Sequence, residues 1–135
     1  MAGVANTSEV RPEERLADAV GILDRLVAFD TTSSRSNLEL IGWVGNYLDG
    51  YGIASTLSAA FEGKANLFAT IGSPEQGGVI LSGHTDVVPV AGQAWDSDPF
   101  RLTERDGKLY GRGSADMKGF IALVLALVPE MVRRV

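Results

Sequence analysis

The sequence of 135 residues has no cysteine and only one histidine. Without thiols there can be no disulfide framework and no thiolate metal site, so any bound metal must be held by oxygen or by imidazole nitrogen. The lack of cysteine also agrees with a reducing compartment. Because the first residues contain no apolar run typical of a secretory signal, we expect a cytoplasmic protein.

Basic charge is also scarce. Twelve Lys and Arg stand against 17 Asp and Glu, giving a net charge of −5, and the longest basic run is Arg133-Arg134. This distribution disfavours a nucleic-acid or anionic-membrane surface. The most apolar stretch, residues 119–128, is about half as long as a membrane span requires and predicts a buried helix. We therefore expect a small-molecule partner, with neither nucleic acid nor membrane.

Helical periodicity marks three segments. Residues 12–29 place apolar side chains at helical spacing behind an acidic first turn. A second helical pattern follows Ser36 and Asn37, either of which can cap it. A third helix is expected to begin near Asp116 or Met117.

Three short, partly β-branched segments separated by turn-like residues predict strands: 53–61, 65–72 and 77–84. The last of them is apolar throughout, which is typical of a strand covered on both faces. Asp106-Gly107 favours a tight hairpin turn. This order of elements predicts an α/β layered domain with a mixed, mostly parallel sheet flanked by helices.

The expected organisation is a flexible N-terminal tail over residues 1–15 and one folded unit over residues 16–135. The chain stops at what reads as the end of a helix, with no further element to cover its apolar faces. We therefore expect the front part of a longer protein, poorly soluble in isolation because its strand edges and helix faces would be exposed.

The single histidine, His84, lies at the end of the predicted strand 77–84 and two residues before Asp86. Side chains at i and i+2 of an extended segment point the same way. One ring nitrogen can then bind a metal while the carboxylate holds the other. Asp116 follows the extended residues 108–110 and would be a hard oxygen ligand able to bridge two divalent ions. If the two strands run parallel, both sites share one sheet edge.

Each of these residues also has a simpler interpretation. His84 can be a hydrogen-bonded histidine at a strand end, Asp86 a turn residue and Asp116 a helix N-cap. Gly111 and Gly113 fit the first two positions of the dinucleotide fingerprint G-x-G-x-x-G, but Asp116 stands at the third, where its charge opposes a pyrophosphate. If these simpler interpretations hold, the chain is not an enzyme but an α/β interaction module.

Four segments together resemble, in order and spacing, the amino-terminal part of the co-catalytic zinc aminoacylase and carboxypeptidase family: 64–72, 82–90, 95–100 and 106–119. The resemblance covers residues 16–135 and implies an incomplete metallohydrolase catalytic domain without the lid and dimerisation domain. It implies two divalent ions, Zn²⁺ or Co²⁺, with His84 as a ligand, Asp116 as a bridge and Asp86 in support of catalysis. It also implies a cis peptide bond at Asp116–Met117.

Within the family the deacetylases are most similar, which implies release of acetate from N-acetyl-L-ornithine to give L-ornithine in arginine biosynthesis, by a homodimeric full-length protein. Desuccinylases of succinyl-diaminopimelate and related dipeptidases or carboxypeptidases share the motifs and remain alternatives. The family's catalytic glutamate, further carboxylate ligands and second histidine lie beyond this segment. The isolated chain is therefore expected to be inactive, and a catalytically dead metal-binding fragment is a further alternative. We expect Arg112 and Lys118 to be solvated at the surface.

Overall fold

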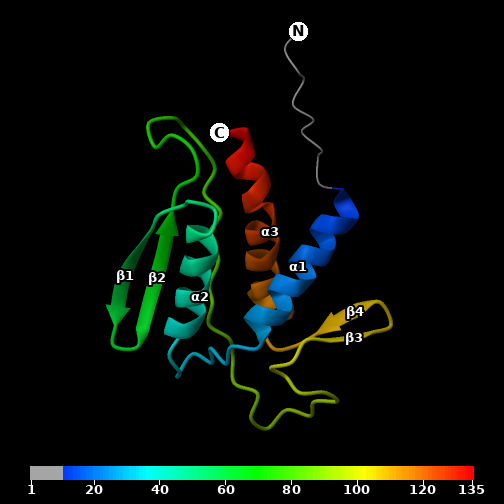
Figure 1. The fold of residues 1–135 in the computed structure, drawn as a ribbon. Coiled ribbons are helices and arrows are strands. Elements are labelled where there is room, and N and C mark those ends of the chain that lie inside the picture. The colour runs from blue at the N-terminus through cyan, green and yellow to red at the C-terminus, as the bar shows by residue number, and fades with distance from the viewer. Residues whose placement is uncertain (1–10) are drawn as a thin grey trace.

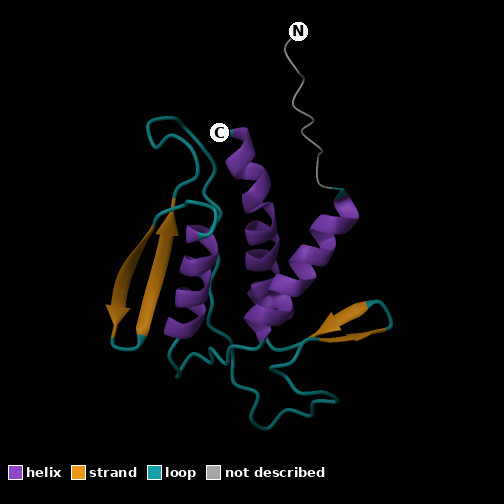
Figure 2. Ribbon diagram, in the orientation of Figure 1, coloured by secondary structure: helices purple, strands orange, loops and turns teal. Residues whose placement is uncertain are grey.

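The computed structural model describes residues 11–135. Its elements follow in chain order: α1 (Pro12–Val27), α2 (Leu38–Asp49), β1 (Ser55–Phe61), β2 (Lys64–Ala69), β3 (Thr103–Arg105), β4 (Lys108–Tyr110), the π-helical turn η1 (Ser114–Lys118) and α3 (Gly119–Arg134). Figure 1 shows the β1–β2 hairpin beside α2, with α3 between α2 and α1. Figure 2 shows one long loop near the C-terminal end of α3 and the other long loops at the opposite end of the helices. The fold class is thus mixed α/β, as predicted.

The core lies between the facing sides of the three α-helices and the β1–β2 hairpin. Leu26 and Val27 at the end of α1 and Leu40 in α2 are fully buried. Burial of a side chain of this size stabilises a fold by about 1.5–3 kcal/mol. Tyr47 donates a hydrogen bond from its hydroxyl to the main-chain carbonyl of Leu125 at 3.0 Å, which joins α2 to α3.

Two of the predicted turns form hairpins, the one after residues 53–61 and Asp106-Gly107. The turn-like residues before 77–84 do not, because that segment lies outside both sheets. β1 pairs antiparallel with β2, and β3 pairs antiparallel with β4. The turn between β3 and β4 has Asp106 at φ 53° and Gly107 at φ 69°. Positive φ at two adjacent residues is what a type I′ turn requires, so the Asp-Gly signal correctly predicted this hairpin.

The predicted mostly parallel sheet is not formed by residues 11–135. Both sheets in this range are two-stranded and antiparallel, and the isolated bridge between Thr32 and Val87 is its one parallel pairing. Residues 77–84, predicted as a strand covered on both faces, are instead exposed and lie outside both sheets. A parallel strand needs neighbours brought to it by crossover connections, and the described part of the chain places no strand beside this segment.

The first helix begins earlier than the expected domain boundary. Residues 12–15 form the first turn of α1, where Glu14 accepts a hydrogen bond from the Arg11 guanidinium at 3.0 Å. The other residues of the expected tail, 1–10, lie outside the described part. No helix within residues 11–135 combines the length and the apolar character needed to cross a membrane.

The extended segment 77–84 is expected to make the isolated chain self-associate. Val79 and Ile80 are each 85% exposed on this segment, which is the kind of exposed apolar edge that pairs with another chain. We expect Ile80→Lys to shift the chain towards monomer in sedimentation velocity over a range of concentrations. Leu16→Lys is the matched control, because Leu16 is also exposed but lies on the surface of α1. A wild-type chain that stays monomeric at high concentration would contradict this expectation.

Candidate metal site

The structure brings His84, Asp86 and Asp116 together. The Nε2 atom of His84 lies 2.9 Å from Oδ1 of Asp116. The other ring nitrogen, Nδ1, lies 3.0 Å from the main-chain carbonyl of Asp86 and 3.2 Å from its carboxylate. Each side chain is close to half exposed or more, so the group lies on an open face. The imidazole is thus held by Asp86 on one side and faces Asp116 with the other.

Hydrogen bonds shift the pKa values of His84 and Asp86. Desolvation lowers the pKa of His84, but hydrogen bonds to Asp116 and to the Asp86 carbonyl, together with the two carboxylate charges, raise it above the ordinary 6.5. The hydroxyl of Ser33 donates to Oδ2 of Asp86 at 2.7 Å. This bond is the main reason that the pKa of Asp86 is lowered. Asp86 is therefore held as an anion beside the ring.

A short polar segment after α1 holds the residues around His84. The hydroxyl of Thr31 donates to the Thr85 carbonyl at 2.5 Å. The amide of Val87 donates to the Thr31 carbonyl, and the amide of Ser33 donates to the Val87 carbonyl, both at 3.0 Å. From sequence, Thr31 and Ser33 were assigned no role, yet they pair with the segment that follows His84.

Asn37 has a different role from the predicted helix cap. Its side-chain amide donates to the carbonyl of Ala65 at 2.9 Å and to the Thr85 hydroxyl at 3.1 Å, and its Oδ1 accepts from the Ala65 amide at 3.0 Å. The hydroxyl of Ser36 accepts a hydrogen bond from the Leu38 amide at the start of α2. Ser36 thus serves the helix start, while Asn37 ties β2 to the residue after His84.

Asp116 lies inside η1, before α3 begins at Gly119. Its interpretation as the N-cap of the last helix is therefore wrong, because a π-helical turn separates it from that helix. Its backbone is extended, at φ −128° and ψ 94°, and its side chain is 87% exposed. The bond to Met117 is cis, as the family resemblance implied.

Glycine allows η1 to lie directly against the chain that follows His84. Gly113 has φ 81°, and a Cβ placed on it would lie 2.6 Å from the Cγ1 atom of Val87. A Cβ on Gly111 would lie 2.8 Å from Cγ1 of Val27 at the end of α1. These two glycines are required for close packing, which accounts for the G-x-G pattern without a nucleotide.

The expectation of surface solvation for Lys118 is wrong, since its side chain is fully buried. Its ammonium donates to the main-chain carbonyl of Phe29 at 2.7 Å. Burial lowers the pKa of Lys118 to about 8, and the charge of Asp30 partly offsets this effect. Arg112 is partly buried and its guanidinium lies 5.1 Å from the centre of the Trp95 ring. Within a single sequence, a lysine beside an apolar helix gives no signal of such burial.

The donor set fits part of a metal site. An imidazole nitrogen and a carboxylate oxygen that face each other are ligands suited to zinc, and a carboxylate on the second ring nitrogen is the usual support of such a histidine. Within residues 11–135, however, no group of three or more His, Cys, Asp or Glu side chains is arranged to hold an ion. The described residues can thus supply two ligands and one supporting carboxylate.

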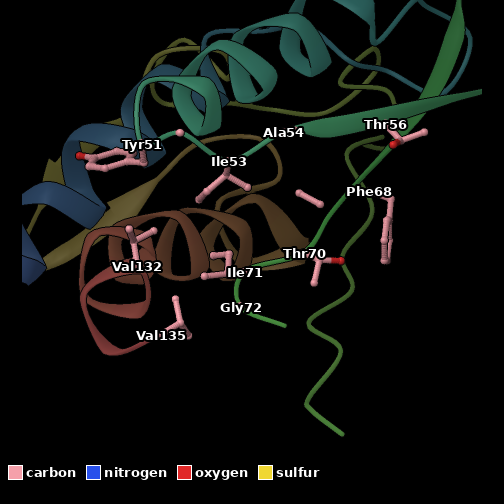
Figure 3. A pocket seen from close by; sticks show the side chains of 12 residues that line it. Tyr51, Ile53, Ala54, Thr56, Phe68, Thr70, Ile71, Gly72, Val132 and Val135 are labelled. Atoms are coloured by element: carbon pink, nitrogen blue, oxygen red, sulfur yellow. The ribbon is translucent and has the colours of Figure 1, made fainter. Parts of the chain in front are cut away.

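A cavity of about 340 Å³ lies elsewhere, between the open end of the β1–β2 hairpin and the last turns of α3 (Figure 3). Its lining includes the apolar side chains of Ile53, Phe68, Ile71 and Val132. Asp116 precedes the start of α3, whereas this cavity touches its end, and a helix of 16 residues is about 24 Å long. The cavity therefore takes no part in the His84 site.

Residues 80–134 match the profile of Peptidase family M20/M25/M40, a range that contains His84, Asp86 and Asp116. The chain belongs to this family. Within it, the chain is similar to acetylornithine deacetylases. It is 47% identical to that of Proteus mirabilis (strain HI4320) over 100 residues, and 45% identical to that of Pasteurella multocida (strain Pm70) over 115 residues.

The fold resembles the crystal structure of human carnosine dipeptidase 1, with a TM-score of 0.75, 26% sequence identity and 90% of this chain covered. The chain spans 30% of that protein. It spans 26% and 30% of the two deacetylases, whose matches cover 73% and 78% of this chain. The match therefore concerns one part of much longer proteins.

Proposed function

We propose that this chain is the amino-terminal part of a metal-dependent amide hydrolase, and that the complete protein releases acetate from N-acetyl-L-ornithine to give L-ornithine. One observation carries the proposal: His84, Asp86 and Asp116 converge from separate segments, within the range that matches the family. The relatives named acetylornithine deacetylase favour this substrate. A soluble, cytoplasmic homodimer and a place in arginine biosynthesis belong to the same proposal.

The site is proposed to hold two divalent ions, Zn²⁺ or Co²⁺. When bound, such ions polarise the acyl carbonyl and lower the pKa of water. His84 would bind through Nε2, because its Nδ1 is held by Asp86. Asp116 would bind through its carboxylate, which already faces Nε2. Asp86 keeps the ring from rotating, so its contribution is orientation.

The three side chains of this group are all assigned to holding or orienting the ions, so the general base is proposed to come from the rest of the complete protein. We therefore propose that residues 16–135 are one part of the catalytic domain and that the isolated chain is inactive. The exposed segment 77–84 would be a strand of the mostly parallel sheet, paired with strands from the rest of the complete protein.

A chimeric enzyme tests the proposal. Residues 16–135 would replace the matching amino-terminal part of the Proteus mirabilis acetylornithine deacetylase. We expect the chimera, supplied with Zn²⁺ or Co²⁺, to release ornithine from N-acetyl-L-ornithine, because this chain supplies the two ligands. The 135-residue chain alone should show no turnover, and the chimera carrying Asp116→Asn should lose at least about 100-fold in kcat.

A folded chimera without turnover would overturn the proposal, as would ordinary turnover by the isolated chain. The likeness to carnosine dipeptidase 1 favours a second candidate, a dipeptidase. Assaying the complete protein on N-acetyl-L-ornithine, on N-succinyl-diaminopimelate and on a dipeptide separates the three substrates. The substrate with the highest kcat/KM then identifies the reaction.

A further inference from the structure

Lys118 is the one charged side chain among the described residues that is fully buried. An ammonium group is costly to remove from water unless a partner compensates it. Its partner is a main-chain carbonyl, that of Phe29, which lies 89 positions away in the sequence. This hydrogen bond therefore links two segments of the fold that are far apart in the sequence.

On one side of this bond lies η1, which carries Asp116. The amide of Lys118 donates to the carbonyl of Gly113 at 2.8 Å and closes this turn. Asp116 lies two positions before Lys118 within the same turn. The bond from the Lys118 ammonium therefore anchors the turn that presents the Asp116 carboxylate.

On the other side lies the segment that holds His84. Phe29 leads directly into Thr31 and Ser33, whose hydrogen bonds fix residues 85–87. The aliphatic part of Lys118 also packs near these residues, since a Cβ on Gly113 would lie 3.3 Å from Cδ of Lys118 and 2.6 Å from Cγ1 of Val87. Both halves of the candidate site therefore meet at one lysine.

We propose that Lys118 is a positioning residue, which fixes the separation of His84 and Asp116 by bonding the Asp116 turn to the segment that holds His84. The inference deepens the proposed function, because that separation determines whether one ion can contact both ligands. Lysine suits this position since its stem fills an apolar space while its end still donates a hydrogen bond. Methionine has a similar length and apolar stem but cannot donate, so Lys118→Met removes the bond with little change in volume.

The test uses the ring of His84 as a probe, since a single histidine gives an unambiguous imidazole signal. Asp116→Asn is first introduced in the wild-type chain without metal, and the shift of the His84 ring carbon and nitrogen signals is measured by NMR at a fixed pH. The same change is then introduced in the Lys118→Met chain. We expect the shift to fall to less than half, because Asp116 would no longer be held against Nε2. Such a cycle isolates the coupling between two residues.

A second readout is the affinity for Zn²⁺, measured calorimetrically. Lys118→Met is expected to weaken binding about 10- to 100-fold, as loss of a supporting partner does at metal sites. Thr31→Val, which removes the next link to Thr85 while keeping the side-chain shape, should act in the same direction. It also keeps the test decisive if Lys118→Met fails to fold.

Val128→Ala is the matched control for a merely structural role. Val128 is 2% exposed in the core on α3, away from the site, so its truncation should lower the melting temperature but leave the Asp116→Asn shift and the zinc affinity unchanged. Equal shifts in the wild-type and Lys118→Met chains, or no shift in either, would overturn the positioning role. If the shifts behave as expected while the wild-type chain binds no zinc, the proposed function fails and the positioning role stands.

Discussion

Replacing His84 with alanine is expected to abolish zinc binding by the 135-residue chain. His84 is the only histidine and there is no cysteine, so no other side chain can supply an imidazole or thiolate ligand. The carboxylate of Asp116, 87% exposed, would remain as a single ligand with solvated oxygens. A wild-type Kd for zinc of about 1 μM would correspond to a binding free energy of about 8 kcal/mol. In a calorimetric titration the variant should give no detectable heat up to about 1 mM zinc.

Asp86→Asn is the graded companion of this experiment. An asparagine can still contact the His84 ring, but it lacks the negative charge that attracts Nδ1. The affinity for zinc should therefore fall about 10- to 100-fold without vanishing. Zinc binding that survives His84→Ala unchanged would contradict the site. It would then favour the alternative of an α/β interaction module, in which His84 is a hydrogen-bonded histidine and nothing more.

The predictions that held depend on neighbouring residues in the chain. The apolar spacing of residues 12–29 predicted α1, and Asp106-Gly107 predicted the β3–β4 hairpin. Both signals concern interactions within a few positions, which a sequence displays directly. The convergence of His84, Asp86 and Asp116 also followed from the sequence, though by the wrong route, because a shared edge of a parallel sheet was expected. The described chain achieves it through the hydrogen bonds of Thr31 and Ser33 and the packing of Gly113.

The expectations that failed depend on distant partners. Lys118 was expected at the surface. Its burial depends on a hydrogen bond to the Phe29 carbonyl, which lies far away in the sequence and could not be predicted locally. Asp116 read as a helix cap because a helix pattern follows it, and nothing in the local sequence signals the π-helical turn between them. Residues 77–84 have the composition of a sheet interior, yet a strand is covered only where neighbouring strands are present. For Lys118 and for residues 77–84, the missing information was the identity of a remote contact.

A large loss of stability is expected for Gly113→Ala. Gly113 has φ 81°, a conformation that costs a residue with a side chain about 1–2 kcal/mol. The added methyl would also lie 2.6 Å from Cγ1 of Val87, which is 3% exposed and cannot move into solvent. Overpacking of this kind costs about 1–3 kcal/mol. The free energy of unfolding should therefore fall by about 2–5 kcal/mol, a large part of the total for a small domain.

Gly92→Ala is the matched control, because it separates the two contributions. Gly92 has a similar φ of 76°, but a Cβ placed on it meets nothing within 4 Å. It should therefore lose only the backbone part, about 1–2 kcal/mol. Both variants are compared by urea titration in the Ile80→Lys background, where association should not interfere. The difference between their free energies of unfolding is the cost of the Val87 contact. Equal losses would mean that η1 does not press against the chain that follows His84, and the arrangement that brings Asp116 to His84 would need another explanation.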